Sequence, residues 1–435
     1  MNRLLQGGLV VACADNAVPQ RADIRIRDGL IVEVGPGLQV GDESIRDVSA
    51  CWVLPGFVQT HIHLCQTLFR GLAEDRELLP WLSERIWPLE AAHTAESAYL
   101  SARLGVAELL LGGTTCIQDM GSLRHTDSAF QACEDWGVWA CVGRALMDEP
   151  NPAGLHASAE VNLAGACAEA DRWHNKGRLR YSFAPRFVPS CSEGLLRETA
   201  QEARRRGARI HTHASENVSE LELVRERTGM DNVEYLASIG LAGPDVGLAH
   251  CIHLSEKEFA ILAETRTRVL HCPTSNMKLG SGIAPVPEML AKNVHVSLGA
   301  DGAPCNNRLD IFSEMRHAGL LQALRNGPGS LSSREILRMA TLSGAEALGL
   351  ESSIGSICPG KSADLVLLNA DSPALLGGGS VEDRIVYAAG PDQIKSVYVG
   401  GELKVNDGVF CEAMRSPTAA EVGSALDSLV ERAGL

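Results

Sequence analysis

Two histidines one residue apart, His61 and His63, stand in the apolar run PGFVQTHIHL at residues 55–64. In an extended strand, residues i and i+2 point to the same side, so both imidazoles can reach one metal ion. The competing interpretation is two core histidines whose ring nitrogens bond to main-chain carbonyls. Taken alone, the H-x-H motif favours that second interpretation.

Two later segments strengthen the case for a metal. ARIHTHASE ends an apolar run with His213 and then reaches Glu216, and VHVSLGADG ends another with Asp301. Taken singly, His213 could be a core residue, Glu216 a polar residue at a helix start, and Asp301 part of an Asp-Gly turn. Together with the first two histidines, His213 and Asp301 complete a set of three imidazole nitrogens and one carboxylate. This ligand set suits Zn²⁺ and leaves room for a water.

His250 in GLAHCIHL ends the next apolar run. A ligand, a base and a core histidine are all compatible with that position. Because four other residues already fill the ligand set, we favour a catalytic role for His250.

These polar residues must be positioned by the elements that precede them. Short apolar runs alternate with longer helical stretches through the middle of the chain, from WVLPGFVQTHIHL to VHVSLGADG. Such alternation predicts a parallel sheet, and the number of repeats fits a (β/α)₈ (TIM) barrel better than an open sheet. The carboxyl ends of barrel strands form one face, so four separate strands would bring the polar residues to one place.

Both ends of the chain predict antiparallel β structure instead. Residues 22–35 (ADIRIRDGLIVEVG) and 396–408 (SVYVGGELKVNDG) alternate apolar and polar side chains around a glycine-containing turn. We therefore expect an α/β protein in three parts. Residues 1–54 form the N-terminal part of a small β-sandwich-like domain, 55–355 form the barrel, and 356–435 complete the β domain and add a terminal helix.

The composition excludes several classes of function. The chain has 435 residues and a formal charge of −15, whereas a nucleic-acid surface needs clustered Lys and Arg. No run of eighteen apolar residues and no secretory leader is found, so we expect no membrane partner and a cytoplasmic location. The thirteen cysteines form no C-x-x-C pair, which excludes zinc ribbons and fingers.

The order H-x-H, H-x-x-E, AHC and LGADG resembles the amidohydrolase superfamily. More narrowly, it resembles the branch that holds S-adenosylhomocysteine, methylthioadenosine and 5′-deoxyadenosine deaminases, guanine deaminases and s-triazine hydrolases. The likeness covers nearly the whole chain, including HCPTSNMKLGSGIAPV, DGAPCNNRLDIFSEMR and GSICPGKSADLVLLN. It implies a barrel enzyme with one metal ion, because no lysine occupies the strand position that bridges two metals in the binuclear branches.

The resemblance also assigns roles. The ligand set defined above would hold one Zn²⁺, with Fe²⁺ as the alternative, and Glu216, His250 and Asp301 would transfer protons. The implied reaction hydrolyses a C–N bond of a cyclic amidine: an activated water attacks a ring carbon, Glu216 protonates the adjacent ring nitrogen, and ammonia leaves. The expected partners are a small heterocyclic substrate, water and further copies of the chain in a homo-oligomer.

One segment favours a nucleoside substrate. TLFRGLAEDRELLPWLSERIWPLE, residues 67–90, resembles the adenosine-type deaminases, in which the position of Glu90 holds the ribose hydroxyls and that of Trp81 lines the pocket. The alternative for Glu90 is a charge on a helix surface, and guanine deaminases show a similar acid there.

A second segment points elsewhere. APRFVPSCS has Arg186 where the adenosine type carries a histidine, and Arg186 with Phe187 resembles the purine-binding motif of guanine deaminases. Gln66 matches a purine-binding glutamine of the same enzymes, although Gln66 and Arg186 could also be scaffolding. AHC and DGAPCNN favour the adenosine type. We therefore expect a deaminase of an aminated purine-type heterocycle, first an adenine nucleoside (5′-deoxyadenosine, methylthioadenosine or S-adenosylhomocysteine). The alternatives are guanine deamination and loss of an amine or chloride from an s-triazine.

Overall fold

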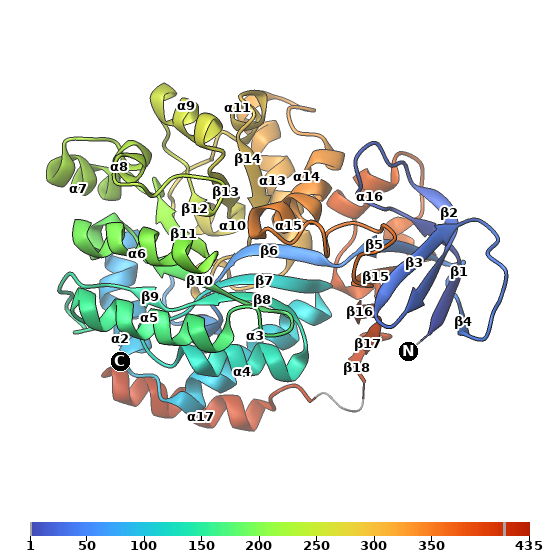
Figure 1. Ribbon diagram of the computed structural model, residues 1–435, viewed down its shortest axis with the longest axis horizontal. Coiled ribbons are helices and arrows are strands. Elements are labelled where there is room, and N and C mark those ends of the chain that lie inside the picture. The colour runs from blue at the N-terminus through green and yellow to red at the C-terminus, as the bar shows by residue number, and fades with distance from the viewer. Residues whose placement is uncertain (1, 412–414) are drawn as a thin grey trace.

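Two β-sheets organise the molecule and lie beside each other (Figure 1). In the computed structural model, which describes residues 2–411 and 415–435, one sheet is parallel and curls into a barrel. The other sheet is built from both ends of the chain. The expected α/β fold, a TIM barrel with a small β domain, is confirmed, and the exact limits of the three parts stay predictions.

The barrel has eight neighbouring parallel strands. In order they are β6 (Phe57–Ile62), β7 (Thr114–Met120), β8 (Trp139–Gly143), β10 (Leu179–Pro185), β11 (Arg209–Ala214), β12 (Val246–His250), β13 (Arg268–His271) and β14 (His295–Leu298). The circle closes where the Asp301 N–H donates to the His61 carbonyl at 2.9 Å. Gly299 permits this approach, because a Cβ there would lie 2.7 Å from the His61 backbone.

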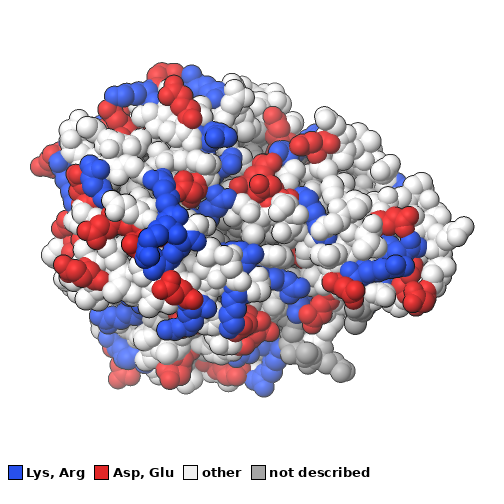
Figure 2. Space-filling model, viewed as in Figure 1, with Lys and Arg blue, Asp and Glu red and all other residues white. Residues whose placement is uncertain are grey.

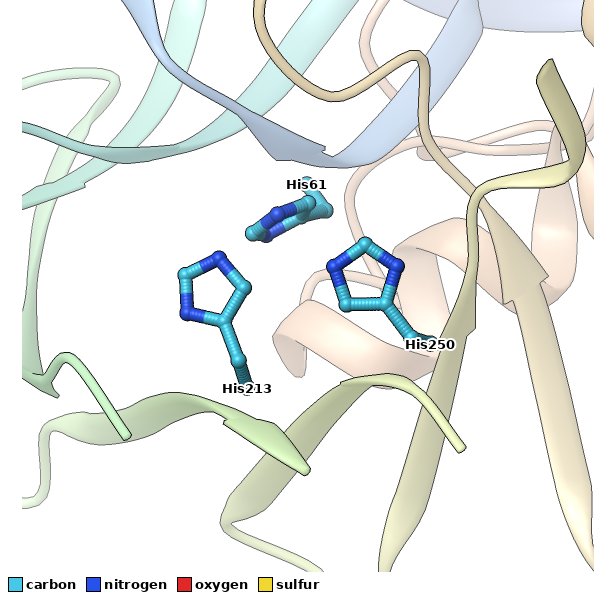
Figure 3. Close-up of side chains that lie close together, drawn as sticks. All are labelled: His61, His213 and His250. Atoms are coloured by element: carbon cyan, nitrogen blue, oxygen red, sulfur yellow. The ribbon is translucent and has the colours of Figure 1, made fainter. Parts of the chain in front are cut away.

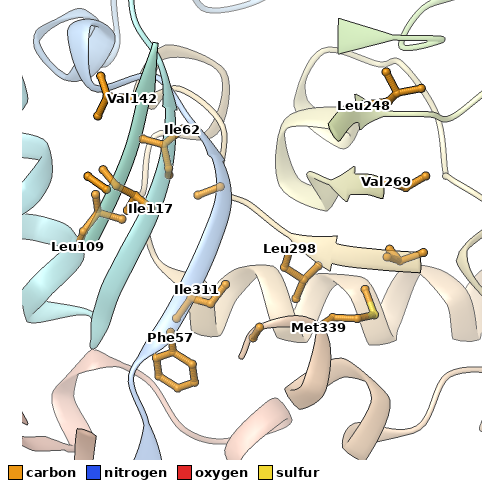
Figure 4. Close-up of a cluster of buried hydrophobic side chains, with 14 of the residues drawn as sticks. Phe57, Ile62, Leu109, Ile117, Val142, Leu248, Val269, Leu298, Ile311 and Met339 are labelled. Carbon is orange, nitrogen blue, oxygen red and sulfur yellow. The ribbon is translucent and has the colours of Figure 1, made fainter. Parts of the chain in front are cut away.

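Helices on the outside of the barrel cover the strands (Figure 1). The principal ones are α3 (Ala95–Leu111), α4 (Thr126–Trp136), α5 (Ala159–Trp173), α6 (Glu193–Arg206), α7 (Val218–Thr228), α8 (Asn232–Ser238), α9 (Glu256–Thr265), α13 (Ile311–Asn326), α14 (Ser333–Met339) and α15 (Leu342–Leu348). Short helices α10 (Pro273–Lys278), α11 (Val286–Ala291) and α12 (Ala303–Asn306) fill loops. Buried apolar side chains of strands and helices interdigitate in one main core, part of which is drawn in Figure 4.

The second sheet is mainly antiparallel and runs in the order β18-β17-β16-β15-β5-β1-β2-β3, with β4 beside β1. Its strands are β1 (Arg3–Val10), β2 (Gln20–Arg27), β3 (Leu30–Gly35), β4 (Ser44–Asp47), β5 (Cys51–Pro55), β15 (Leu365–Asn369), β16 (Ile394–Val399), β17 (Glu402–Asn406) and β18 (Val409–Phe410). The turn between β2 and β3 has φ +49° at Asp28 and +81° at Gly29, and positive φ at both central residues is typical of a type I′ hairpin turn. Helix α16 (Val381–Tyr387) lies between β15 and β16 in the chain.

Directly after β6 the chain forms four short helical elements, which we call the cover segment, residues 64–91. They are η1 (Leu64–Phe69), α1 (Leu78–Trp81), the π-helical turn η2 (Leu82–Ile86) and α2 (Trp87–Ala91). One apolar cluster joins this segment to Leu429, the buried residue of the C-terminal helix α17 (Ala419–Ala433). In the described parts of the chain, no helix is both long and apolar enough to cross a membrane.

Candidate active site

Four side chains from three strand ends bring their donor atoms together. His61 lies in β6 and His63 directly follows it, His213 lies in β11, and Asp301 follows β14. Asp301 Oδ1 lies 3.4 Å from His61 Nε2 and 3.3 Å from His63 Nε2. His213 Nε2 lies 3.4 Å from His63 Nε2. Figure 3 shows the rings of His61, His213 and His250 facing one another across this space.

The outer nitrogens of these rings are already committed, which leaves the inner ones for a metal. His63 Nδ1 and His213 Nδ1 donate to the carbonyls of Met120 and Arg186, each at 2.7 Å. A carbonyl only accepts, so Nε2 of both rings carries the lone pair. His61 Nε2 is buried and has no hydrogen-bond partner among the described residues. Three converging lone pairs beside one carboxylate fit a divalent metal such as zinc.

Asp301 is held in place from both sides of its carboxyl group. Its backbone has φ +64°, a left-handed conformation that aspartate tolerates better than most residues. Ser275 Oγ donates to Oδ2 at 2.6 Å, and the Gly302 N–H donates to Oδ1 at 2.7 Å. Burial opposes ionisation, but His61 and His63 hold the pKa of the Asp301 carboxyl well below its usual value. Asp301 is therefore an anion.

His250, at the end of β12, faces the same space as a neutral base. Its Nδ1 donates to Asn276 Oδ1 at 2.8 Å, so Nε2 has the free lone pair. That Nε2 lies 3.5 Å from Glu216 Oε2 and 3.8 Å from Asp301 Oδ2. Burial lowers the pKa of the His250 imidazole, which keeps the ring uncharged and able to accept a proton.

Glu216 is the natural proton donor of the group. Burial first, and then the charges of Asp301 and Glu220, raise the pKa of the Glu216 carboxyl well above its usual value. Its own backbone N–H donates to Glu220 Oε2 at 2.7 Å, which fixes the loop after β11. A protonated carboxyl beside a neutral imidazole supplies an acid and a base in one place.

A cavity connects these groups to the cover segment. Its wall is formed by His63, Leu78, Trp81, Leu82, Arg186, Phe187, His213, Glu216, His250, Leu279 and Asp301. The open volume is about 20 Å³, close to the space that one water molecule needs. Small-molecule pockets measure about 300–1,000 Å³. This volume is too small for a purine-sized substrate, and Leu78, Trp81 and Leu82 of the cover segment form part of the wall.

Arg186 stands between this cavity and two of the predicted substrate-binding residues. Its guanidinium pairs with Glu90 through Nη1–Oε2 at 2.7 Å and Nη2–Oε1 at 3.1 Å. Gln66 Nε2 adds a third hydrogen bond to Glu90 Oε1 at 2.8 Å. Trp81, Phe187 and Arg186 line the cavity, whereas Gln66 and Glu90 lie behind Arg186. Glu90 is 1% exposed, so it is not a charge on a helix surface.

Comparison with known proteins agrees with this geometry. The Amidohydrolase family profile matches residues 52–404. The chain belongs to the amidohydrolase family. A 5′-deoxyadenosine deaminase of Methanothermobacter thermautotrophicus is 37% identical over 391 residues, 89% of this chain and 90% of its own. A 5-methylthioadenosine/S-adenosylhomocysteine deaminase of Moorella thermoacetica is 36% identical over 410 residues, 93% of this chain and 94% of its own.

A solved structure extends the comparison to three dimensions. An adenosine deaminase from Xanthomonas campestris with bound zinc superposes with a TM-score of 0.92 at 30% identity, covering 100% of this chain and 98% of its own. The resemblance expected from the sequence motifs is therefore confirmed. As an amidohydrolase, the protein is a metal-dependent hydrolase that acts on C–N bonds.

Several residues of this amidohydrolase site escaped the sequence analysis. His211, two residues before His213 in ARIHTHASE, received no role from the sequence, yet its Nε2 lies 2.7 Å from His61 Nδ1. Ser275 and Asn276 hold Asp301 and His250 and belong to the HCPTSN stretch after β13, which was noted only as part of a family likeness. The available signal was a run of small polar residues at the end of a barrel strand.

Proposed function

We propose that the protein is a zinc-dependent aminohydrolase that removes ammonia from an adenine nucleoside such as 5′-deoxyadenosine, methylthioadenosine or S-adenosylhomocysteine. The observation that carries the proposal is the placement of His63, His213 and Asp301 on one cavity with a proton-holding Glu216, while His61 lies against Asp301. The similarity to deaminases of 5′-deoxyadenosine and methylthioadenosine supports the substrate class. Zinc in the Xanthomonas campestris structure supports Zn²⁺ over Fe²⁺.

In this proposal His61, His63, His213 and Asp301 would hold the ion, whose Lewis acidity would lower the pKa of a water to about 7. Asp301 Oδ2 and His250 Nε2, 3.8 Å apart, accept the proton that this water loses. Glu216 donates its carboxyl proton to the ring nitrogen next to the attacked carbon, which gains negative charge as the carbon becomes tetrahedral. The group that took the proton of the water, His250 or Asp301, then gives it to the departing amine, and the proton on the attacking oxygen restores the Glu216 carboxyl as the ring C=O bond forms.

Trp81 and Phe187 would flank the substrate, because both lie on the cavity wall. Opening of the cover segment would admit the substrate, and closure over the ring would exclude bulk water from the reacting atoms.

A second candidate substrate is guanine, whose ring carries an oxo group, and an aminated or chlorinated s-triazine is a further alternative. The observation that favours it is the Arg186–Glu90 pair. Both Glu90 oxygens accept hydrogen bonds from Arg186, and one also accepts from Gln66, so few acceptor sites remain for a ribose diol. Arg186 instead lines the cavity. The N–H groups of a guanidinium can donate a pair of hydrogen bonds to an oxo group and an adjacent ring nitrogen.

A release assay on zinc-loaded protein tests both candidates. Ammonia should appear with at least one of the adenine nucleosides, and ranking them by kcat/KM identifies the substituent on the ribose. Preference for guanine or an amino-triazine would select the second candidate, and chloride release would select the triazine branch of it. No ammonia and no chloride from any of these compounds would refute the proposal. Metal analysis of the same preparation distinguishes zinc from iron.

We also propose that the enzyme works as a homo-oligomer. Leu320 and Leu324, one helical turn apart on α13, are 47% and 79% exposed, which supports that helix as a contact surface. The cytoplasmic location expected from the sequence stays a prediction.

A further inference from the structure

A second cavity lies at the opposite end of the barrel strands from the metal-donor residues. It opens beside Arg180, the second residue of β10, and Arg209, the first residue of β11. The same two strands carry Arg186 and His213 at or just past their other ends. The cavity has a volume of about 610 Å³ and is separate from the cavity that contains the proposed catalytic groups.

The wall of this cavity is strongly basic. Arg180, Arg204, Arg206 and Arg209 line it together with a single carboxylate, Asp245. The lining residues therefore carry an excess of three positive charges within a chain whose formal charge is −15. Figure 2, drawn in the orientation of Figure 1, shows Lys and Arg side chains gathered over the region of α6 and β10.

Two of the four arginines have no carboxylate partner. Arg204 Nε donates to Asp245 at 2.9 Å, and Arg206 Nε donates to Asp171 at 2.9 Å. Arg180 bonds only to main-chain carbonyls, at 2.8 and 2.9 Å, and Arg209 only to one carbonyl, at 2.5 Å. Among the described residues, no Asp or Glu lies within ion-pair distance of either side chain, which leaves donor groups of both guanidiniums for a ligand.

Arg209 lies against the backbone of Gly349. Gly349 ends α15 with φ +68°, and a Cβ at that position would lie 2.0 Å from Arg209 Nη2. Glycine at 349 thus leaves the space in which the guanidinium sits. The Arg180 guanidinium lies over the ring of Trp139, 5.8 Å from its centroid, which holds the second donor in place.

The helix dipole explains only half of this cluster. Arg204 and Arg206 lie in the last turn of α6, where the partial negative charge of the carbonyls attracts cations. Arg180 and Arg209 lie on strands, so that explanation does not apply to them. Neighbouring Arg268, at the start of β13, has a buried Nε without a hydrogen-bond partner in the described chain. Burial first, and then the Arg209 charge, lower the pKa of Arg268, and Glu346 and Glu351 offset only part of this effect.

We propose that this cavity binds a small molecule through a phosphate group, with Arg209 and Arg180 as its main donors. Guanidinium groups present paired N–H donors that match phosphate oxygens, and a phosphate dianion offsets more of the excess charge than one carboxylate does. The site does not depend on the proposed deaminase reaction, because none of its residues lines the catalytic cavity.

Isothermal titration of the metal-loaded protein tests the site, with inorganic phosphate, diphosphate and AMP as probes in a phosphate-free buffer of low ionic strength. We expect saturable binding of one anion per chain for at least one probe. Tighter binding of AMP would identify a nucleotide phosphate, and tighter binding of diphosphate a free phosphate compound. Arg209→Gln and Arg180→Gln should each weaken binding about tenfold or more. Arg197→Gln, an exposed position of α6 paired with Glu193, should leave it unchanged.

A second measurement uses the native protein, so it does not require that the variants fold. Modification of the native protein with phenylglyoxal, mapped by peptide mass, should spare Arg180 and Arg209 when the tightest probe is present, while Arg197 reacts as before. Absence of saturable binding by all three probes would overturn the proposal. So would binding that disappears with the metal and survives Arg209→Gln, because that anion would lie at the metal-donor residues.

Discussion

His211 Nε2 lies 2.7 Å from His61 Nδ1, and both rings are fully buried. If the lone pair of His61 Nε2 binds the proposed metal, the hydrogen of that ring lies on Nδ1, and His211 Nε2 accepts it. Burial and the neighbouring histidines lower the pKa of His211 well below its usual value, which keeps it a neutral acceptor. The pair fixes the tautomer and orientation of a proposed metal ligand, as outer hydrogen bonds do at metal sites in general.

Replacing His211 should therefore weaken metal binding without touching a ligand. His211→Leu removes the acceptor, and we expect the zinc affinity to fall about 10–100-fold. His211→Gln keeps an amide oxygen near the position of Nε2 and should recover part of the loss. Competition with a chromogenic chelator measures both constants.

His125→Asn provides the matched control for the His211 variants, because this partly buried histidine bonds only to the His93 carbonyl. Its zinc affinity should equal that of the wild type. An unchanged affinity in His211→Leu would show that the contact with His61 does not support the metal site.

The buried Arg186–Glu90 pair gives a prediction about stability. Both side chains are at most 4% exposed, so removing one partner leaves a charge in a medium that solvates it poorly. Arg186→Met should lower the free energy of unfolding by about 3–5 kcal/mol. The double variant Arg186→Met/Glu90→Gln removes both charges and should recover most of that loss. Urea unfolding of the metal-free wild type and both variants measures these free energies of unfolding.

A surface ion pair serves as the control for the variants at positions 186 and 90. Arg197→Met breaks the exposed ion pair with Glu193 and should change stability little. A double variant at positions 186 and 90 that is no more stable than the single variant would show that packing, not the unpaired carboxylate, causes the loss.

The metal-donor residues could be placed from the sequence because their positions follow from local geometry. His61 and His63 share a strand face, and the carboxyl ends of parallel strands meet on one side of a barrel. The Arg186–Glu90 pair could not be foreseen in this way. Its members are 96 residues apart, and each separately matched a different substrate type. Only the packing of the cover segment on the strand ends brings them together.

The basic cavity could not be predicted from the sequence, for a related reason. Net charge is a sum over the whole chain, and a value of −15 says nothing about where charges gather. Arg180 and Arg209 are separated by a helix and become neighbours because β10 and β11 pair in parallel. The packing of α17 on the cover segment, through Leu429, likewise depends on contacts between distant parts of the chain.

Asp119 gives a prediction about pH and stability. Its Oδ1 accepts the Leu64 N–H at 2.6 Å, its Oδ2 is buried without a partner, and burial raises its pKa to about 7. In the unfolded chain the carboxyl ionises near its usual value of 3.8. The folded state thus binds the Asp119 proton more tightly than the unfolded state does, and this difference adds to the free energy of unfolding. The contribution is complete below pH 4 and is lost as pH rises to about 7. The loss is roughly 4 kcal/mol at most.

Asp119→Asn keeps the Oδ1 acceptor and removes the ionisation. Relative to the wild type, the variant should gain stability steadily between pH 4 and pH 8. Urea unfolding of both proteins at several pH values in this range measures the difference. Parallel curves for the two proteins would show that the Asp119 carboxyl ionises normally in the folded state.

Glu216→Gln tests the proposed acid most directly. The amide has nearly the same size but holds no transferable proton, and Glu216 is not one of the proposed ligands. Metal content should stay at the wild-type level while turnover of the best substrate falls about 10²–10⁴-fold. KM should change little, since the ring nitrogen can still meet a hydrogen-bond donor. Glu222→Gln, an exposed position on α7, should retain full activity. Wild-type turnover in Glu216→Gln would show that Glu216 takes no part in the reaction. Loss of metal in the same variant would show that Glu216 is a metal ligand instead.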